Sequence, residues 1–218
     1  YERPSYSHFT SMAYWHTGAP NGGDEFGWMG RTADVMRSQK AEDILINVGS
    51  TQSLAVKSAI HTPLVFDDPM RFQRSYWMNQ VDFSSSAELS YKSSNHEFLK
   101  AVDLTAKSSA RRIRKAWSDY ETNVDYGIVP MDLPKVASCI DAGLETQLYH
   151  VSFRNNAFDT HVQQPNLHRR LLSYASDAIF GFVNDLQRLG HSDRVVVMVY
   201  SEFGRRVPEN ANLGTDHG

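Results

Sequence analysis

Acidic and imidazole side chains stand close together in the last third of the chain. Asp159 and His161 are two positions apart, Asp216 and His217 are adjacent, and Glu202 lies between the two pairs. Carboxylate oxygens and neutral imidazole nitrogens form a ligand set that suits zinc, manganese or iron. Either pair alone is also typical of a turn with a surface histidine. The prediction of a metal site therefore depends on the fold bringing these groups together.

Two apolar runs precede these groups and are predicted to be strands. Residues 146–153 and 194–200 are rich in β-branched and apolar side chains, and the second run suits a strand buried on both faces. Between them, residues 166–189 form an amphipathic helical pattern that Gly190 ends. Strand, helix and strand in this order predict a right-handed βαβ unit with parallel strands. Because ligands bind beyond the carboxyl ends of such strands, we expect the acids and histidines to converge in one pocket there.

Further elements are predicted upstream of this unit. Residues 43–48 and 64–66 are short apolar runs that suit buried strands, and residues 95–120 and 133–142 have helical periodicity. Residues 67–94 lack a clear period and are predicted to be an irregular insertion. The local markers are an N-cap at Asp132, a first-turn proline at Pro134, a C-cap at Gly143 and a solvent-facing basic cluster at 111–115. Together these elements predict one α/β domain over residues 1–218, with a largely parallel central sheet and helices on both faces.

Composition and chain ends restrict the function further. Of the 218 residues, 41% are hydrophobic and 22% charged, which is typical of a globular protein with a sizeable core. The net charge of −3 gives no sign of a nucleic-acid partner. Cys139 is the single cysteine, so it can form no internal disulfide and is expected to be a buried thiol. No signal peptide or membrane-length apolar run is present. Because the chain begins without Met and stops just after His217, we expect the domain to be incomplete at both ends.

Five motifs resemble one bacterial family when they are taken in order. They are Ser-His-Phe with Trp-x-Thr-Gly within residues 7–18, Gly-Trp-Met-Gly-Arg at 27–31, Phe-Asp-Thr-His at 158–161, Ser-Glu-Phe-Gly-Arg at 201–205 and Gly-Thr-Asp-His-Gly at 214–218. In this pattern the chain resembles domain of unknown function 1501, a family related to alkaline phosphatases and sulfatases. The resemblance implies an alkaline-phosphatase-like fold with a site for two divalent metal ions, either zinc or else calcium or manganese. It also implies hydrolysis of a small-molecule or polysaccharide phosphate or sulfate ester, a planctomycete-type source and an exported or periplasmic location.

The resemblance also suggests roles for single residues. Ser7 matches the position of the nucleophile, although Ser5, Thr10 and Ser11 compete for that role, and Ser7 also suits a helix N-cap. Arg205 is expected to contact an anionic ester, with a salt bridge beside the site as the alternative, and Arg31 is a weaker candidate for the same contact. Asp159, His161, Glu202, Asp216 and His217 are the expected metal ligands. His168 is a further candidate that also reads as a solvated helix residue. The superfamily pattern needs one more metal-binding Asp upstream of Tyr1, so the chain as given is expected to be inactive if that residue is missing.

Two other functions fit the same scaffold. One is a phosphotransferase resembling phosphoglycerate mutase. The other is an exported binding or surface protein that keeps the fold without catalysis.

Overall fold

Three short parallel strands form the central sheet of the molecule. The computed structural model describes residues 5–20, 24–36, 43–73, 94–153 and 156–218. Strands β1 (Leu45–Val48), β2 (Leu64–Phe66) and β3 (Leu148–Val151) lie in the order β2-β1-β3, and both pairings are parallel. The strands predicted at 43–48, 64–66 and 146–153 are confirmed. The protein is therefore a mixed α/β domain with a parallel sheet flanked by helices.

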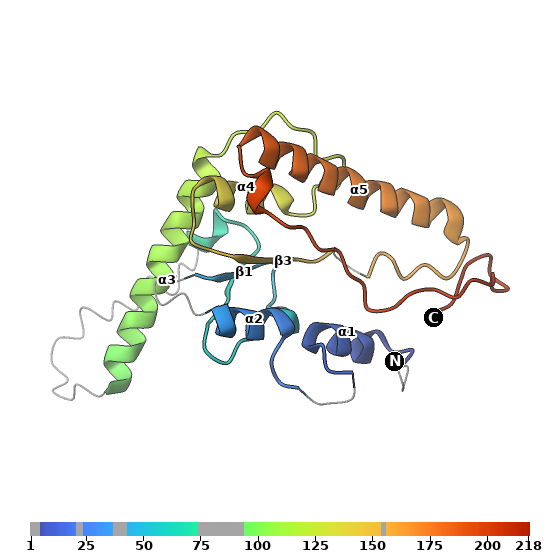
Figure 1. The fold of residues 1–218 in the computed structure, drawn as a ribbon, viewed down its shortest axis with the longest axis horizontal. Helices are drawn as coiled ribbons and strands as arrows, with labels where there is room; N and C mark the ends of the chain where they lie inside the picture. Colours follow the sequence, from blue (N-terminus) through green and yellow to red (C-terminus); the bar gives the residue numbers. More distant parts are fainter. Residues whose placement is uncertain (1–4, 21–23, 37–42, 74–93, 154–155) are drawn as a thin grey trace.

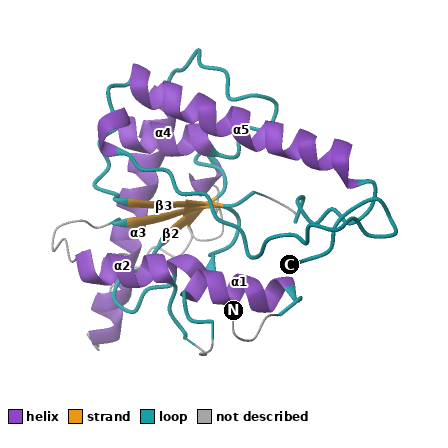
Figure 2. Cartoon of the chain, turned by 45° about the vertical axis from the view of Figure 1, so that its right-hand side comes forward, coloured by secondary structure: helices purple, strands orange, loops and turns teal. Residues whose placement is uncertain are grey.

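Helices cover both faces of this sheet, as Figures 1 and 2 show. Side chains alternate along β1 as a pleated strand requires, so Ile46 and Val48 join one core while Leu45 joins the other. The first core packs helices α3 (Ser94–Asp119), α4 (Leu133–Asp141) and α5 (Gln164–Arg188) on one side. The second packs α2 (Trp28–Met36) and a short 3-10 turn, η1 (Leu54–Val56), on the other side. Helix α1 (His8–Thr17) lies on the same side as α2 and contacts η1.

The predicted helices are confirmed with small shifts of their ends. Gly143 and Gly190 follow α4 and α5 with φ of 68° and 76°, in the left-handed region where glycine is favoured. Asp132 lies at the N-cap position of α4, but its side chain makes no capping bond and pairs with Lys135 at 2.6 Å instead. Cys139 is buried, and burial raises the pKa of its thiol to about 12, as expected of a structural cysteine.

The basic cluster on α3 is only partly directed to solvent. Arg111 and Lys115 are exposed, as predicted. Arg112 instead turns inward, where its guanidinium pairs with the buried carboxylate of Asp43 at 2.5 Å. Ser109 donates to the same carboxylate at 2.8 Å. Arg112 departs from the prediction because a buried charge needs a partner, which helical periodicity does not reveal.

The strand predicted at 194–200 is wrong. A 3-10 turn, η4 (Ser192–Arg194), follows α5, and the chain then continues extended without joining the sheet. Val196, Met198 and Val199 are 94%, 60% and 72% exposed. The valines favour an extended backbone, but a strand also needs a neighbouring backbone to pair with, and β3 remains the edge strand of the described sheet. The predicted βαβ unit around α5 is therefore absent from the described part of the chain.

Other predictions concern segments that the structure describes only in part. Most of the insertion predicted at 67–94 lies outside the described residues, which include a 3-10 turn at its start, η2 (Arg71–Gln73). Among the described helices, none is long and apolar enough to cross a membrane.

Candidate metal centre

Four separate stretches of sequence meet around the carboxylate of Asp159. Its Oδ1 atom lies 2.7 Å from His161 Nε2 and 2.9 Å from His217 Nε2. Its Oδ2 atom lies 3.1 Å from Nε2 of His8. His8 in turn contacts Glu202, with 2.8 Å between Nδ1 and Oε1. The structure thus brings the predicted ligands Asp159, His161, Glu202 and His217 to one place.

Asp216 lies at the outer side of the same cluster. Its Oδ1 atom is 3.5 Å from His161 Nδ1 and accepts a hydrogen bond of 2.9 Å from Asn210. These hydrogen bonds, that from Asn210 foremost, lower the pKa of the Asp216 carboxyl below its ordinary value. The carboxylate is therefore ionised and held beside the imidazole of His161.

His8 is a candidate site residue that the sequence analysis missed. It opens α1, and its side chain is only 18% exposed. Its ring packs against His217 and Phe203, with ring centroids 4.6 and 4.9 Å apart. Its place directly after Ser7 in the Ser-His-Phe motif was the available signal. That signal could not be used because His8 is about 150 positions from the other candidates, and spacing along the chain says nothing of such a long contact.

The acid at the centre of the cluster is strongly ionised. Partial burial acts to raise the pKa of Asp159, but its close contacts with His217, His8 and His161 lower it to about 2. One carboxylate thus faces three imidazoles, and its charge is fully present at neutral pH. Such a centre attracts protons or a cation.

The donor atoms fit a divalent metal. Nε2 of His8 is buried and makes no hydrogen bond of good geometry, although an acid lies beside it. His161 Nε2 and His217 Nε2 face each other at 2.9 Å. Zinc binds nitrogen and oxygen at about 2.0–2.1 Å, which sets neighbouring ligands of a tetrahedral site about 3.3 Å apart. The donor atoms of His8, Asp159 and His217 all lie within 4.8 Å of one another, and the Asp159 oxygens lie 2.7–3.1 Å from the three imidazole nitrogens around them.

Arg205 ties together the two loops that carry these ligands. Its guanidinium donates to the carbonyls of Phe158 and Thr160 at 2.6 and 2.9 Å, and to that of Thr215 at 2.6 Å. It also lies 3.8 Å from Asp159 Oδ1. Its side chain is 18% exposed, so the structure gives it a positioning place within the protein scaffold.

A glycine lets the same two loops approach closely. A Cβ atom on Gly214 would lie 2.2 Å from the carbonyl oxygen of His161, which is closer than any real contact. Asn210 fastens the approach, since it donates to that carbonyl at 3.2 Å and to Asp216. The Gly-Thr-Asp-His-Gly motif therefore begins with a glycine for a steric reason.

Ser7 lies beside the cluster, and in the described part of the chain its side chain forms no hydrogen bond with the cluster. It occupies the N-cap position of α1, its side chain makes no capping bond, and it is exposed. Its neighbours on both sides touch the centre, since the Tyr6 carbonyl lies 3.3 Å from His217 Nδ1 and His8 contacts Asp159. The structure thus puts a hydroxyl at a helix start next to the candidate metal centre.

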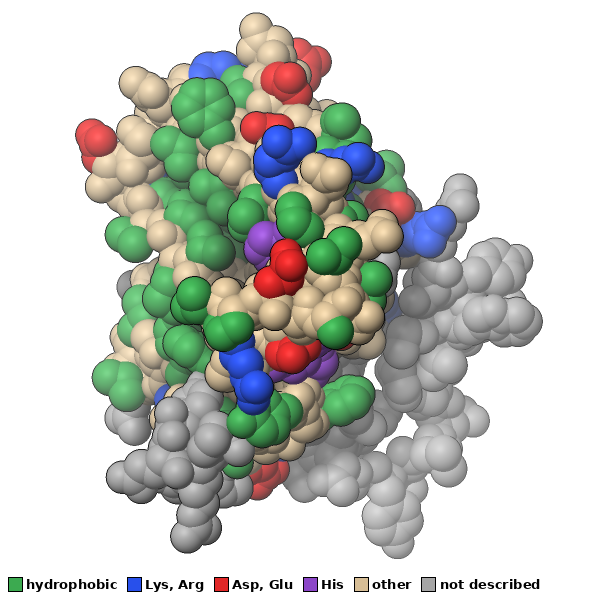
Figure 3. Space-filling view, turned by 90° about the vertical axis from the view of Figure 1, so that its right-hand side faces the viewer, with side chains coloured by type: hydrophobic (Ala, Val, Ile, Leu, Met, Phe, Trp, Pro, Cys, Tyr) green, Lys and Arg blue, Asp and Glu red, His purple; other side chains and the backbone are tan. Residues whose placement is uncertain are grey.

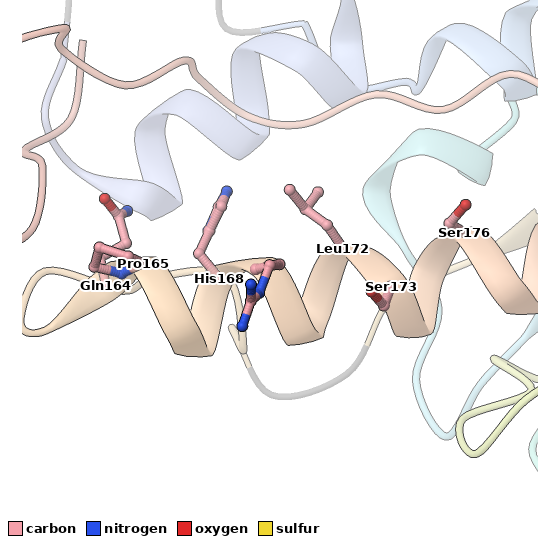
Figure 4. Close-up of a pocket in the computed structure, with 7 residues that line it drawn as sticks. Gln164, Pro165, His168, Leu172, Ser173 and Ser176 are labelled. Atoms are coloured by element: carbon pink, nitrogen blue, oxygen red, sulfur yellow. The ribbon is translucent and has the colours of Figure 1, made fainter.

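His168 and Arg31 are not brought to this cluster by any described contact. His168 Nδ1 lies 3.3 Å from the Thr160 hydroxyl, behind the loop that carries His161. It lines a shallow hollow of about 460 Å³ on α5, where Gln164, Leu172 and Ser176 point to the same side (Figure 4). Arg31 donates to the carbonyls of Thr17 and Phe26, and so fastens α1 to the loop before α2.

A second group of aromatic side chains gathers around Tyr200. His150 in β3 lies 3.1 Å from Asn47 Oδ1 and 3.2 Å from the Tyr200 hydroxyl. Trp15 stacks on Tyr200 with centroids 6.2 Å apart, and Trp28 meets it edge-on at 6.3 Å. Trp28 is half-buried, whereas Trp15 is 42% exposed and covers Tyr200 from the solvent side.

The candidate centre opens on the face that carries the C-terminal loop. Figure 3 shows acidic and histidine side chains together on this face, with hydrophobic side chains around them. Tyr6 and Phe9 near the start of α1 are 60% and 86% exposed. The side chains of Asp159 and His161 are 33% and 35% exposed. A ligand from solvent can therefore reach the cluster.

The comparisons with known proteins give one match. A family model described as Protein of unknown function (DUF1501) matches residues 2–218, which is nearly the whole chain. Neither the curated proteins nor the solved structures give a match.

Proposed function

We propose, from the premise that this chain belongs to the family described as Protein of unknown function (DUF1501), that it is a metal-dependent hydrolase of phosphate or sulfate esters. The observation that carries the proposal is the cluster of three imidazoles and three carboxylates beyond β3. Its members are His8, Asp159, His161, Glu202, Asp216 and His217. The parallel sheet flanked by helices is consistent with the alkaline-phosphatase-like fold that the motifs resemble.

The cluster, Ser7 and Arg205 would have different roles in ester hydrolysis. The cluster would hold divalent metal, with its acids ionised and its imidazoles neutral. A metal there withdraws charge from ester oxygens and lowers the pKa of an attacking hydroxyl. Ser7 would supply that hydroxyl, and the start of α1 offers backbone N–H groups that the helix itself leaves unpaired. Arg205 would keep the ligand loops at their spacing rather than bind the ester.

A metal and ester panel on paired variants tests this proposal. Zn²⁺, Mn²⁺ and Ca²⁺ binding would be measured by titration calorimetry, and hydrolysis on p-nitrophenyl phosphate and p-nitrophenyl sulfate. We expect Asp159→Asn to lose metal affinity and at least about 100-fold in kcat/KM, since the carboxylate at the centre of the cluster is removed. Asp193→Asn, at an exposed acid on η4, should leave both unchanged.

The outcomes separate this function from its alternatives. Metal binding without hydrolysis of any ester would overturn the enzyme and favour the exported binding protein. Phosphoryl transfer to an alcohol in preference to water would favour the phosphotransferase. Undiminished hydrolysis by Asp159→Asn would show that the cluster takes no part in the reaction. An exported location belongs to the same proposal, and finding the protein only in the cytoplasm of its source would contradict it.

A further inference from the structure

The two nitrogens of His8 face different acids, and this fixes which of them carries the proton. Nδ1 lies 2.8 Å from Oε1 of Glu202. An ionised carboxylate accepts hydrogen bonds but does not donate them, so Nδ1 must carry the hydrogen. The neutral ring then presents a lone pair at Nε2, and that atom is buried, lacks a hydrogen bond and points toward Asp159.

His217 repeats this arrangement with a different acceptor. Its Nδ1 lies 3.3 Å from the carbonyl oxygen of Tyr6, which can only accept. Its Nε2 lone pair therefore faces Asp159 Oδ1 and His161 Nε2, each at 2.9 Å. His161 follows the pattern more loosely, with Asp216 3.5 Å from its Nδ1. Lone pairs that face a carboxylate repel it unless a cation lies between them.

Metal-binding histidines usually donate their other ring N–H to a carboxylate or a backbone carbonyl, which fixes the tautomer and the ring orientation. We propose that His8 is a metal ligand of this site through Nε2, and that Glu202 is a positioning residue that holds its Nδ1–H rather than a ligand. Asp159, His161 and His217 complete the ligand set, with the Tyr6 carbonyl in the role of Glu202 for His217. This inference rests on the proposed metal site and changes which residues are assigned to it.

The contacts of the His8 ring support a rigid ligand. Glu202 holds one edge of the ring, while Phe203 and His217 pack on it. Because Glu202 and Phe203 are adjacent in sequence, a single short segment both orients the ring and covers it. The extended chain after η4 thus leads directly to the residue that sets the His8 tautomer.

Binding of Zn²⁺ and Co²⁺ to purified variants tests the inference without an activity assay. We expect His8→Ala to weaken Zn²⁺ binding by more than the 10–100-fold that loss of an outer partner typically costs, and Glu202→Ala to weaken it within that range. Glu202→Gln keeps an acceptor for Nδ1–H, so we expect it to stay within about 10-fold of the unaltered protein. Co²⁺ absorption bands should change in His8→Ala and persist in Glu202→Gln.

Control variants distinguish the loss of a metal ligand from misfolding and from a failure of the proposed function. His191→Gln, at the histidine that precedes η4 and pairs with Asp141, should bind Zn²⁺ as the unaltered protein does. Thermal unfolding of each metal-free variant reports its folding. If His8→Ala keeps full Zn²⁺ affinity, or if Glu202→Gln alters the Co²⁺ bands as much as His8→Ala, the inference is wrong while the hydrolase remains. If the unaltered protein binds no metal, both fail.

Discussion

At the scale of single residues, His150 shows how burial selects one protonation state. The imidazole is buried in β3, where Nδ1 donates to Asn47 Oδ1 and the Tyr200 hydroxyl donates to Nε2. Asn47 Oδ1 also accepts from the Ser53 backbone N–H, which fixes its orientation. Both ring nitrogens are therefore satisfied only in the neutral form. Burial first, and the neighbouring His16 second, lower the pKa of His150 from 6.5 to about 4.

This lowered pKa predicts a loss of stability in mild acid. Above pH 6.5 the ring is neutral in the folded and the unfolded chain and adds no pH dependence. Between pH 6.5 and about 4 the unfolded chain takes up a proton that the folded protein refuses, so the free energy of unfolding falls as the pH falls. The shift amounts to about 3 kcal/mol across that window. Urea unfolding at several pH values measures it.

Two variants isolate the contribution of His150 from that of other titrating groups. His150→Gln removes the group, so its stability should decline less steeply than that of the unaltered protein between pH 6.5 and 4. His168→Gln, on the half-exposed start of α5, should keep the unaltered slope. Parallel curves for the unaltered protein and His150→Gln would mean that His150 does not resist protonation.

At the scale of elements, the two ligand loops depend on one planar side chain. Arg205 reaches carbonyls of both loops at once, because its guanidinium carries donors in a fixed fork. A lysine has a single ammonium and cannot span the same three acceptors. We expect Arg205→Lys to weaken Zn²⁺ binding about 10–100-fold, as removal of an outer-shell partner does. Titration calorimetry measures the affinity.

A control and a second readout separate positioning from general stability. Arg170→Lys replaces an exposed arginine on α5 and should leave Zn²⁺ affinity unchanged. If Arg205 mainly positions the metal ligands, the melting temperature of metal-free Arg205→Lys should stay close to that of Arg170→Lys. Unchanged affinity in Arg205→Lys would contradict the positioning role.

Local patterns predicted most elements but not the contacts between them. Helical periodicity and the glycines after α4 and α5 located those helices, because each of these signals depends only on residues that are close in sequence. The residues 158–161, 202 and 216–217 were expected to meet because motifs and predicted strand ends placed them together. His8 was missed because its contact with Asp159 depends on how α1 packs against the rest of the chain. The run 194–200 was misassigned because strand propensity says nothing of whether a partner is present.

At the scale of the whole molecule, one apolar segment is left outside both cores. Val195 still packs partly buried against the larger core. The extended chain from Val196 to Val199 then leads to Tyr200, and it makes no ladder to the described sheet. Its backbone runs from the end of α5 back toward the loop at the C-terminus (Figure 1). Exposed β-branched residues in an extended segment without charges are an available edge for another strand. Whether this segment is exposed or covered in solution can be measured through the free energy of unfolding.

The same substitution at an exposed and at a buried valine measures that state. Val196 is 94% exposed, whereas Val48 in β1 is 3% exposed and packs in the larger core. Val→Thr keeps the branched shape but adds a hydroxyl, which costs about 1–3 kcal/mol when it is buried without a partner. We expect Val48→Thr to lower the free energy of unfolding by that amount, and Val196→Thr to change it by less than about 0.5 kcal/mol, as surface substitutions do. Urea unfolding of both variants at several protein concentrations gives the comparison. Equal destabilisation at both positions would show that the segment is covered in solution, and a concentration dependence confined to Val196→Thr would identify a second copy of the chain as the cover.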